Sequence, residues 1–213
     1  MTHQGELFSA APLDTLRFEK AAYGNGFTYV AGIDEAGRGP LAGPVIAAAV
    51  ILPVGFSITG VDDSKKLTPD KREKLFDVIM TQAMSVGVGV VNPVEIDRIN
   101  ILQATRCAML AAVQQLSPQP DFLLIDGIST INSTVPQKTI IKGDSLSLSI
   151  AAASIIAKVT RDMFMIEMDS SYPEYGFAGH KGYGSAAHME AIRRHGPSPI
   201  HRLTFGGVKE YVE

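Results

Sequence analysis

Two acidic residues stand side by side at the end of an apolar run, where a strand would be expected to enter the core. Asp34 and Glu35 follow "FTYVAGI" and precede the glycine-rich segment "AGRG". A third acid, Asp126, ends another short apolar run, and Asp144 stands just before a long apolar segment. Clustered carboxylates repel one another, so a site built from them must take up protons or bind cations. Hard oxygen ligands of this kind favour Mg²⁺ or Mn²⁺ over zinc.

Each acid also has an ordinary structural interpretation. Asp126 alone is as typical of a turn residue, and Asp144 alone is more typical of a helix N-cap. Asp34 and Glu35 together serve no packing role. If the strands that end at Asp34 and Asp126 are parallel neighbours, both carboxylates lie at the carboxyl edge of the sheet, where open α/β sheets bind ligands. Glu35 joins Asp34 only if the chain is already turning, because successive strand residues point to opposite faces.

The apolar patterns predict the elements that must position these acids. We expect strands at residues 27–34, 43–52, 85–91, 121–127 and 137–144. We expect helices at 71–84, at 92–116 with a break near Asn100, at 145–168, and from the cap Ser185 to Gly196. Residues 171–184 form a Gly- and Tyr-rich loop in this prediction. Strands cluster early and later alternate with helices, which indicates an α/β class with a mixed sheet.

The overall composition is that of a folded globular protein. A length of 213 residues suits one domain, predicted here at 28–213 after a loosely ordered N-terminal lead-in at 1–27. The net charge of -3 gives no global attraction to phosphate backbones or anionic membranes, so an anionic partner must be met locally. We find neither a signal peptide nor an apolar stretch of the ~20 residues that a membrane span needs, which favours the cytoplasm.

Two single residues carry further expectations. A single cysteine, Cys107, excludes an internal disulfide and a cysteine-rich zinc site. We expect Cys107 to lie in a helix, with its side chain buried in the protein core. Most basic residues form small groups typical of solvated faces. Lys158 is the exception because it lies within the most apolar helix, where a charge needs a partner or a site nearby.

A dinucleotide-binding loop is an alternative use of the glycines. Gly37, Gly39 and Ala42 satisfy a G-x-G-x-x-A pattern after a strand. However, Pro40 and Pro44 and a β-branched run follow where that fold needs a helix, and the two preceding carboxylates would repel a pyrophosphate. The pattern therefore gives only weak support to this function.

Six motifs, in order along the chain from about residue 29 to 208, resemble bacterial ribonuclease HII, the type 2 ribonuclease H. They are "AGIDEAGRGPLAGPVIAAAVIL", "DDSKKL", "LLIDG", "KGDSLSLSIAAASIIAKVTRD", "GHKGYGSAAH" and "HRLTFGGV". The resemblance implies a ribonuclease H-like fold, a mixed five-stranded sheet flanked by helices. It also implies Mg²⁺- or Mn²⁺-dependent cleavage of the RNA strand of RNA/DNA hybrids. Nicking of duplex DNA 5′ of an embedded ribonucleotide, to leave 3′-hydroxyl and 5′-phosphate ends, is implied as well.

The resemblance also assigns the site. The acidic residues that hold the metals fall on Asp34, Glu35, Asp126 and Asp144. In such a site one metal activates a water and a second stabilises the leaving oxygen. A hybrid-binding protein that does not cut is the other possibility, but pure binding would be helped by removing these negative charges.

Substrate contacts follow from the same resemblance. The backbone of Gly37, Arg38 and Gly39 approaches the ribose 2′-hydroxyl in this family, and Tyr183 matches the tyrosine that packs on the sugar at the RNA-to-DNA junction. Expected phosphate contacts are Ser64, Lys65, Lys142, Lys158 and Lys181. We expect a monomer that binds no membrane, and the sequence names no replication partner.

Overall fold

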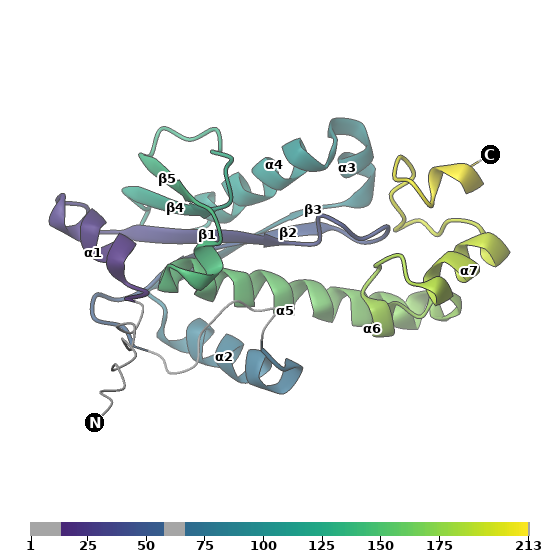
Figure 1. The fold of residues 1–213 in the computed structure, drawn as a ribbon, viewed down its shortest axis with the longest axis horizontal. Helices are drawn as coiled ribbons and strands as arrows, with labels where there is room; N and C mark the ends of the chain where they lie inside the picture. The colour runs from purple at the N-terminus through teal and green to yellow at the C-terminus, as the bar shows by residue number, and fades with distance from the viewer. Residues whose placement is uncertain (1–13, 58–66, 213) are drawn as a thin grey trace, which may run out of the picture.

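The protein is built on one five-stranded mixed sheet (Figure 1). The computed structural model describes residues 14–57 and 67–212. The strands are β1 (Val30–Ala36), β2 (Val45–Ile51), β3 (Ser85–Val91), β4 (Phe122–Asp126) and β5 (Gln137–Ile140), in the order β3-β2-β1-β4-β5. β1 and β3 are antiparallel to β2, whereas β1, β4 and β5 are mutually parallel. The predicted α/β class and five-stranded mixed sheet are confirmed.

Helices cover both faces of this sheet. They are α1 (Arg17–Gly24), α2 (Pro69–Gln82), α3 (Pro93–Ile99), α4 (Ile101–Gln114), α5 (Leu148–Ser171), α6 (Phe177–His180) and α7 (Ala186–His195). The described residues also contain the short 3₁₀ turns η2 (Gly143–Ser145), η3 (Pro173–Tyr175) and η4 (Lys209–Tyr211). α3 and α4 lie over one face and α2 and α5 over the other, while α1 and the α6–α7 region occupy opposite ends of the molecule (Figure 1). No helix in the described ranges is long and apolar enough to cross a membrane.

The central strands are apolar because both faces of the sheet are covered. All seven residues of β2 are buried, with Ala47 and Ala49 packed towards α4 and Ala48 and Val50 towards α2 and α5. β1 lies directly against the start of α5: a Cβ on Gly32 would come 2.1 Å from the carbonyl carbon of Ser149. A side chain at this position would push the strand away from the helix.

Several predicted boundaries are confirmed and others are wrong. Asn100 does interrupt the second predicted helix: with φ of 68°, it ends α3, and its Oδ1 accepts hydrogen bonds from the first turn of α4. The lead-in is not loosely ordered over residues 14–27, because α1 forms there and buries Glu19 and Ala22. The loop expected at 171–184 contains η3 and α6. Cys107 lies on the exposed side of α4, since the apolar stripe of that helix passes through Ala104 and Ala108.

Candidate active site

Asp34 and Asp126 lie side by side at the carboxyl ends of two parallel strands. The register pairs Ile33 of β1 with Ile125 of β4, so the next residue of each strand is one of these acids. Asp34 is 4% exposed, and its Oδ1 accepts a hydrogen bond of 2.7 Å from the Glu35 N–H. The pairing is parallel, which is the condition set in the sequence analysis, and it brings together two carboxylates that are 92 positions apart in the sequence.

Asp144 joins them through the turn η2. The Gly143 N–H donates to Oδ1 of Asp126 over 2.6 Å, which ties the turn to the end of β4. Asp144 follows directly and is 6% exposed. The N-cap interpretation of Asp144 is wrong, because Ser147 caps α5 by accepting from the Ile150 N–H. The predicted strand at 137–144 ends at Ile140, and the turn that follows it places the acid.

The start of α5 is held in place by α1, an element that the sequence analysis missed. Oε1 of Glu19 accepts hydrogen bonds from the Ser147 hydroxyl at 2.6 Å, the Ser149 hydroxyl at 2.7 Å and the Ser149 N–H at 3.0 Å. The Leu148 N–H donates to the Thr15 carbonyl over 2.9 Å. These contacts satisfy N–H groups that a helix start leaves without partners. They also fix the chain three residues after Asp144.

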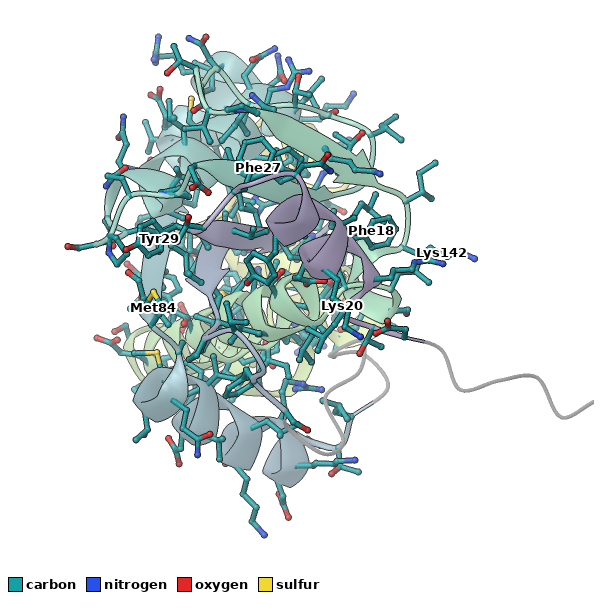
Figure 2. The ribbon with its side chains drawn as sticks, turned by 90° about the vertical axis from the view of Figure 1, so that its left-hand side faces the viewer. Phe18, Lys20, Phe27, Tyr29, Met84 and Lys142 are labelled. Atoms are coloured by element: carbon teal, nitrogen blue, oxygen red, sulfur yellow. The ribbon has the colours of Figure 1, made fainter. Side chains whose placement is uncertain are left out.

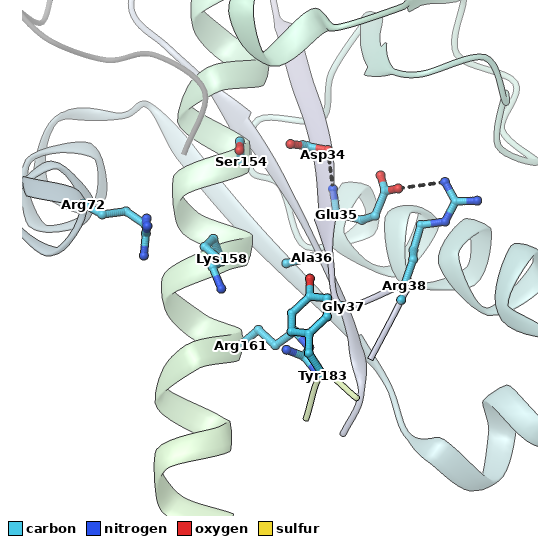
Figure 3. Close-up of a pocket in the computed structure, with 11 residues that line it drawn as sticks. Asp34, Glu35, Ala36, Gly37, Arg38, Arg72, Ser154, Lys158, Arg161 and Tyr183 are labelled. Atoms are coloured by element: carbon cyan, nitrogen blue, oxygen red, sulfur yellow. Dashed lines mark hydrogen bonds and ion pairs between the residues drawn. The ribbon is translucent and has the colours of Figure 1, made fainter. Parts of the chain in front are cut away.

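Glu35 is placed differently from the other acids. β1 continues to Ala36, so the chain has not yet turned at Glu35, and its side chain points towards Arg38 rather than towards Asp34 (Figure 3). Oε1 of Glu35 accepts from Nη1 of Arg38 over 3.1 Å, in an ion pair between a largely buried acid and an exposed base. The sequence analysis expected the Glu35 side chain to lie beside Asp34 only if the chain turned at this point. The backbone does not turn there.

The acids nevertheless act on one another electrostatically. Burial raises the pKa of Asp34 well above its ordinary value, and the charges of Glu35, Asp126 and Asp144 raise it further. Within residues 14–57 and 67–212, no three His, Cys, Asp or Glu side chains are already arranged to enclose a metal ion. The donor set is therefore right for a hard cation, while Glu35 would have to turn inward to complete it.

A cavity of about 420 Å³ opens beside Asp34 and Glu35, whereas Asp126 and Asp144 are not among its lining residues (Figure 3). It is lined by Asp34, Glu35, Ala36, Gly37, Arg38, Gly39, Arg72, Ser154, Lys158, Arg161 and Tyr183. The Tyr183 ring is half-exposed and lies over the glycine-rich loop: a Cβ on Gly39 would come 3.7 Å from Cε1 of that ring. The cavity thus has acids on one wall, cations on another and an aromatic ring at its mouth.

Arg202 binds the backbone of the loop formed by Gly37, Arg38 and Gly39. This fully buried guanidinium donates to the carbonyls of Gly37 at 2.5 Å, Arg38 at 3.0 Å and Gly43 at 3.0 Å. The N–H groups of Arg38 and Gly39 have no acceptor among the described residues. With its carbonyls held inward, the loop presents those N–H donors to the cavity.

A second buried arginine holds the other end of the loop. Arg161 of α5 donates to the carbonyls of Ala42 at 3.0 Å, Pro44 at 3.1 Å and Lys181 at 2.9 Å. It leaves no room for a side chain at Gly37, whose φ is +95° and whose Cβ would lie 2.1 Å from Nε of Arg161. Burial lowers the pKa of Arg161, and it lowers the pKa of Arg202 to about 9, so both remain cationic at neutral pH.

The predicted lysines are distributed unevenly. Lys158 lines the cavity and donates to Asp162 over 2.7 Å, which confirms that its charge has a partner. Lys142 is exposed on the turn before Asp144, outside the cavity lining. The Lys181 ammonium turns back to the carbonyl of Ala178 at the end of its own helix. Ser64 and Lys65 lie outside the described residues.

Three cavity or loop cations were missed by the sequence analysis. Arg72 lines the cavity from α2 and lies 3.6 Å from Asp162, but nothing in its local sequence distinguishes it from a solvated helix residue. Arg202 follows a histidine in an irregular segment and likewise carries no local signal. Arg161 could have been found, because it stands in the same apolar helix that drew attention to Lys158.

Three histidines support the turn that carries Tyr183. The Ser198 N–H donates to Nδ1 of His201, so the His201 proton is on Nε2 and is donated to Nε2 of His188 over 2.9 Å. Nδ1–H of His188 then donates to the Tyr183 carbonyl over 2.9 Å. His180 stacks on His188 with ring centroids 4.3 Å apart. The bond from the Ser198 N–H requires a neutral His201 ring, and the bond between the two histidines requires a neutral His188 ring.

These histidines predict an acid-sensitive fold. Burial lowers the pKa of both His188 and His201 to about 4 from 6.5. As pH falls from about 6.5 to about 4, the unfolded chain binds protons that the folded chain does not, so the free energy of unfolding falls. At about 1.4 kcal/mol per pKa unit, a shift from 6.5 to about 4 corresponds to on the order of 3 kcal/mol for each histidine, and we expect a loss of at least this size, measured by urea unfolding at stepped pH. The exposed His195, changed to Asn, should leave this dependence intact. A constant free energy of unfolding between pH 7 and 5 would show that the rings are not held neutral.

Comparisons with known proteins show the family to which this chain is similar. The ribonuclease HII family matches residues 31–208. The ribonuclease HII of Pelobacter propionicus is 67% identical over 209 residues, covering 98% of this chain and 95% of that protein. The ribonuclease HII of Geobacter metallireducens is 65% identical and covers 92% of each. The chain belongs to the ribonuclease HII family.

Solved structures show the same architecture. Ribonuclease H2 from Pyrococcus horikoshii superposes with a TM-score of 0.72 at 30% identity, over 86% of this chain and 97% of that one. Bst-RNase HIII, solved in complex with Mn²⁺, gives 0.69 at 22% identity, over 90% of this chain and 71% of that one. The ribonuclease H-like fold is thereby confirmed. As a member of the ribonuclease HII family, the chain is a ribonuclease H that acts on RNA/DNA hybrids.

Proposed function

We propose that this ribonuclease is a divalent-metal-dependent endonuclease that cuts the RNA strand of hybrids and also nicks duplex DNA 5′ of a single embedded ribonucleotide. The products are a 3′-hydroxyl and a 5′-phosphate. The observation that carries the proposal is the convergence of Asp34, Asp126 and Asp144 from separate elements, with the pKa of Asp34 raised by the surrounding charge. A buried cluster of negative charge beside a phosphate-binding cavity is unfavourable until a cation occupies it.

The group that fits these acids is Mg²⁺ or Mn²⁺. Asp34, Asp126 and Asp144 would hold it, and Glu35 would join them on exchanging its Arg38 partner for the ion. When bound, divalent ions at such a site lower the pKa of water and neutralise charge on the phosphate and its leaving oxygen. Lys158 and Arg72, on the opposite wall, bind the phosphate and orient it towards the acids.

Selection of RNA over DNA rests on the loop of Gly37, Arg38 and Gly39. The ribose 2′-hydroxyl is the group that separates the two nucleic acids, and it can accept hydrogen bonds from backbone N–H groups. Arg202 holds the loop carbonyls inward, so the donors of Arg38 and Gly39 face the substrate. A loop held in this way needs no rearrangement when the ribose arrives, which lowers the cost of binding.

Tyr183→Ala should weaken the preference for the junction more than it weakens the fold. The ring is half-exposed, so little apolar burial is lost, whereas its position over Gly39 suits it to pack on the sugar after the ribonucleotide. We expect a roughly tenfold fall in kcat/KM for the embedded ribonucleotide and a smaller one for a continuous hybrid. Tyr183→Phe is the matched control and should keep most of the activity. Equal losses on both substrates would show that Tyr183 does not act specifically at the RNA-to-DNA junction.

One assay tests the proposal directly. A duplex with a single ribonucleotide is incubated with Mg²⁺, with Mn²⁺ and with chelator, and the product ends are mapped. We expect one nick on the 5′ side of the ribonucleotide, a 3′-hydroxyl on the upstream DNA, and no product with chelator. Stable binding without products at any metal concentration would instead favour a non-cutting hybrid binder. We also propose that the protein acts as a monomer.

A further inference from the structure

A group of exposed cations surrounds one aromatic ring on the face that carries α1. The Arg17 guanidinium lies 4.6 Å and the Lys138 ammonium 5.1 Å from the centroid of the Phe18 ring. Lys142, four residues after Lys138, is also exposed, and Figure 2 shows it at the same edge of this view as Phe18. We refer to Arg17, Phe18, Lys138 and Lys142 as the α1 basic patch.

In the described part of the chain these cations are not neutralised by a direct ion pair, although Asp14 interacts electrostatically with Arg17. Within residues 14–57 and 67–212, none of Arg17, Lys138 and Lys142 forms an ion pair, whereas the neighbouring Lys20 is bound to Asp14 at 2.8 Å. Cation–π contacts with a partly exposed ring are each worth only about 0.5–1 kcal/mol, and like charges gathered on one ring repel. In a chain with a net charge of -3, such a local excess of positive charge indicates an anionic partner.

The patch is joined rigidly to the candidate active site. Phe18 packs in a small core with Ile140 and Leu146, which flank the turn that carries Asp144. Glu19, the next residue of α1, binds Ser147 and Ser149 at the start of α5. The patch therefore cannot shift without moving the turn, and it lies at the opposite end of the molecule from α6 and α7, between which Tyr183 is carried (Figure 1).

We propose that the α1 basic patch binds the sugar-phosphate backbone of the substrate duplex, on the side of the scissile phosphate away from Tyr183. The inference rests on the proposed function, because it extends the same duplex past Asp144 onto α1. The Arg17 and Lys138 side chains neutralise phosphates and release counterions, and Phe18 holds the two side chains in place. The contact carries no sequence preference, since phosphates look alike at every step.

The test is the salt dependence of binding for the variant Arg17→Ala/Lys138→Ala. Binding is read by fluorescence anisotropy in an Asp126→Asn background, so that cleavage does not interfere. Each lost phosphate contact lowers the slope of log affinity against log salt by about 0.9, so we expect a drop of roughly two units and a roughly tenfold weaker Kd near 0.1 M salt. Lys209→Ala, an exposed charge at the other end of the molecule, should leave the slope unchanged.

Duplexes extended on only one side of the ribonucleotide sharpen the test. The loss should appear with the extension that reaches the patch and disappear with the other, while kcat at saturating substrate stays at the wild-type value in a wild-type background. An unchanged slope, or an equal loss with both extensions, would overturn the proposal. The α1 basic patch would then be expected to bind an acidic protein instead. Failure of the wild type to nick the ribonucleotide would count against the proposed function instead, because the anisotropy does not depend on cleavage.

Discussion

Asp126→Asn is expected to lower the rate of nicking by at least about 10³-fold while duplex binding persists. The substitution is nearly isosteric, and the amide oxygen can still accept the bond of 2.6 Å from the Gly143 N–H. The turn that carries Asp144 should therefore stay in place. What is lost is one negative charge beside Asp34, and with it one ligand for the cation. The measurement is single-turnover cleavage of an embedded ribonucleotide at saturating Mg²⁺ and again at saturating Mn²⁺.

The same strand supplies a matched control. Asp121 precedes β4 at its other end, and its carboxylate accepts from the N–H groups of Thr28 at 2.7 Å and Tyr29 at 2.9 Å. Asp121→Asn makes the same chemical change far from the cavity and should leave the cleavage rate within about twofold of the wild type. Full activity of Asp126→Asn, or an equal loss in both variants, would contradict the assignment of the site.

Arg202→Lys should reduce activity on the embedded ribonucleotide by roughly 10- to 100-fold and destabilise the fold. A lysine ammonium cannot reproduce the planar set of donors that reaches the carbonyls of Gly37, Arg38 and Gly43. Each buried carbonyl left without a donor costs about 1–3 kcal/mol, so we expect the free energy of unfolding to fall by roughly 3 kcal/mol. The loop would then no longer present its N–H groups in one fixed arrangement.

Stability and positioning can be separated in this variant. The free energy of unfolding gives the folded fraction at the assay temperature, and the cleavage rate is divided by that fraction. We expect the corrected rate on the ribonucleotide substrate to stay low, with a raised KM that reflects lost backbone contacts. Arg193→Lys, at an exposed ion pair with Glu190, is the control and should change neither quantity. A corrected rate equal to that of the wild type would limit Arg202 to a structural role.

Local sequence patterns were enough to predict the strands that carry two of the site's acids. The apolar run before Asp34 and the one before Asp126 each indicated a buried strand, and two strands that end in the same way were expected to share a sheet edge. The parallel register of β1 and β4 confirms this. Spacing alone favoured a helix N-cap for Asp144 over a metal ligand. The family resemblance reversed that choice, and the structure shows Ser147 as the cap.

The sequence by itself determined the strands, the acids that end them and the family to which the chain belongs, because periodicity and ordered motifs are local properties of the chain. Only the tertiary structure decided how the site is held. Glu19 meets Ser147 across 128 positions, and Arg202 meets Gly37 across 165. No short-range pattern records such contacts, since a carbonyl or a hydroxyl finds its distant partner only when the packing of the sheet brings the two segments together. For the same reason the direction of Glu35, which depends on where β1 ends, was left open by the sequence.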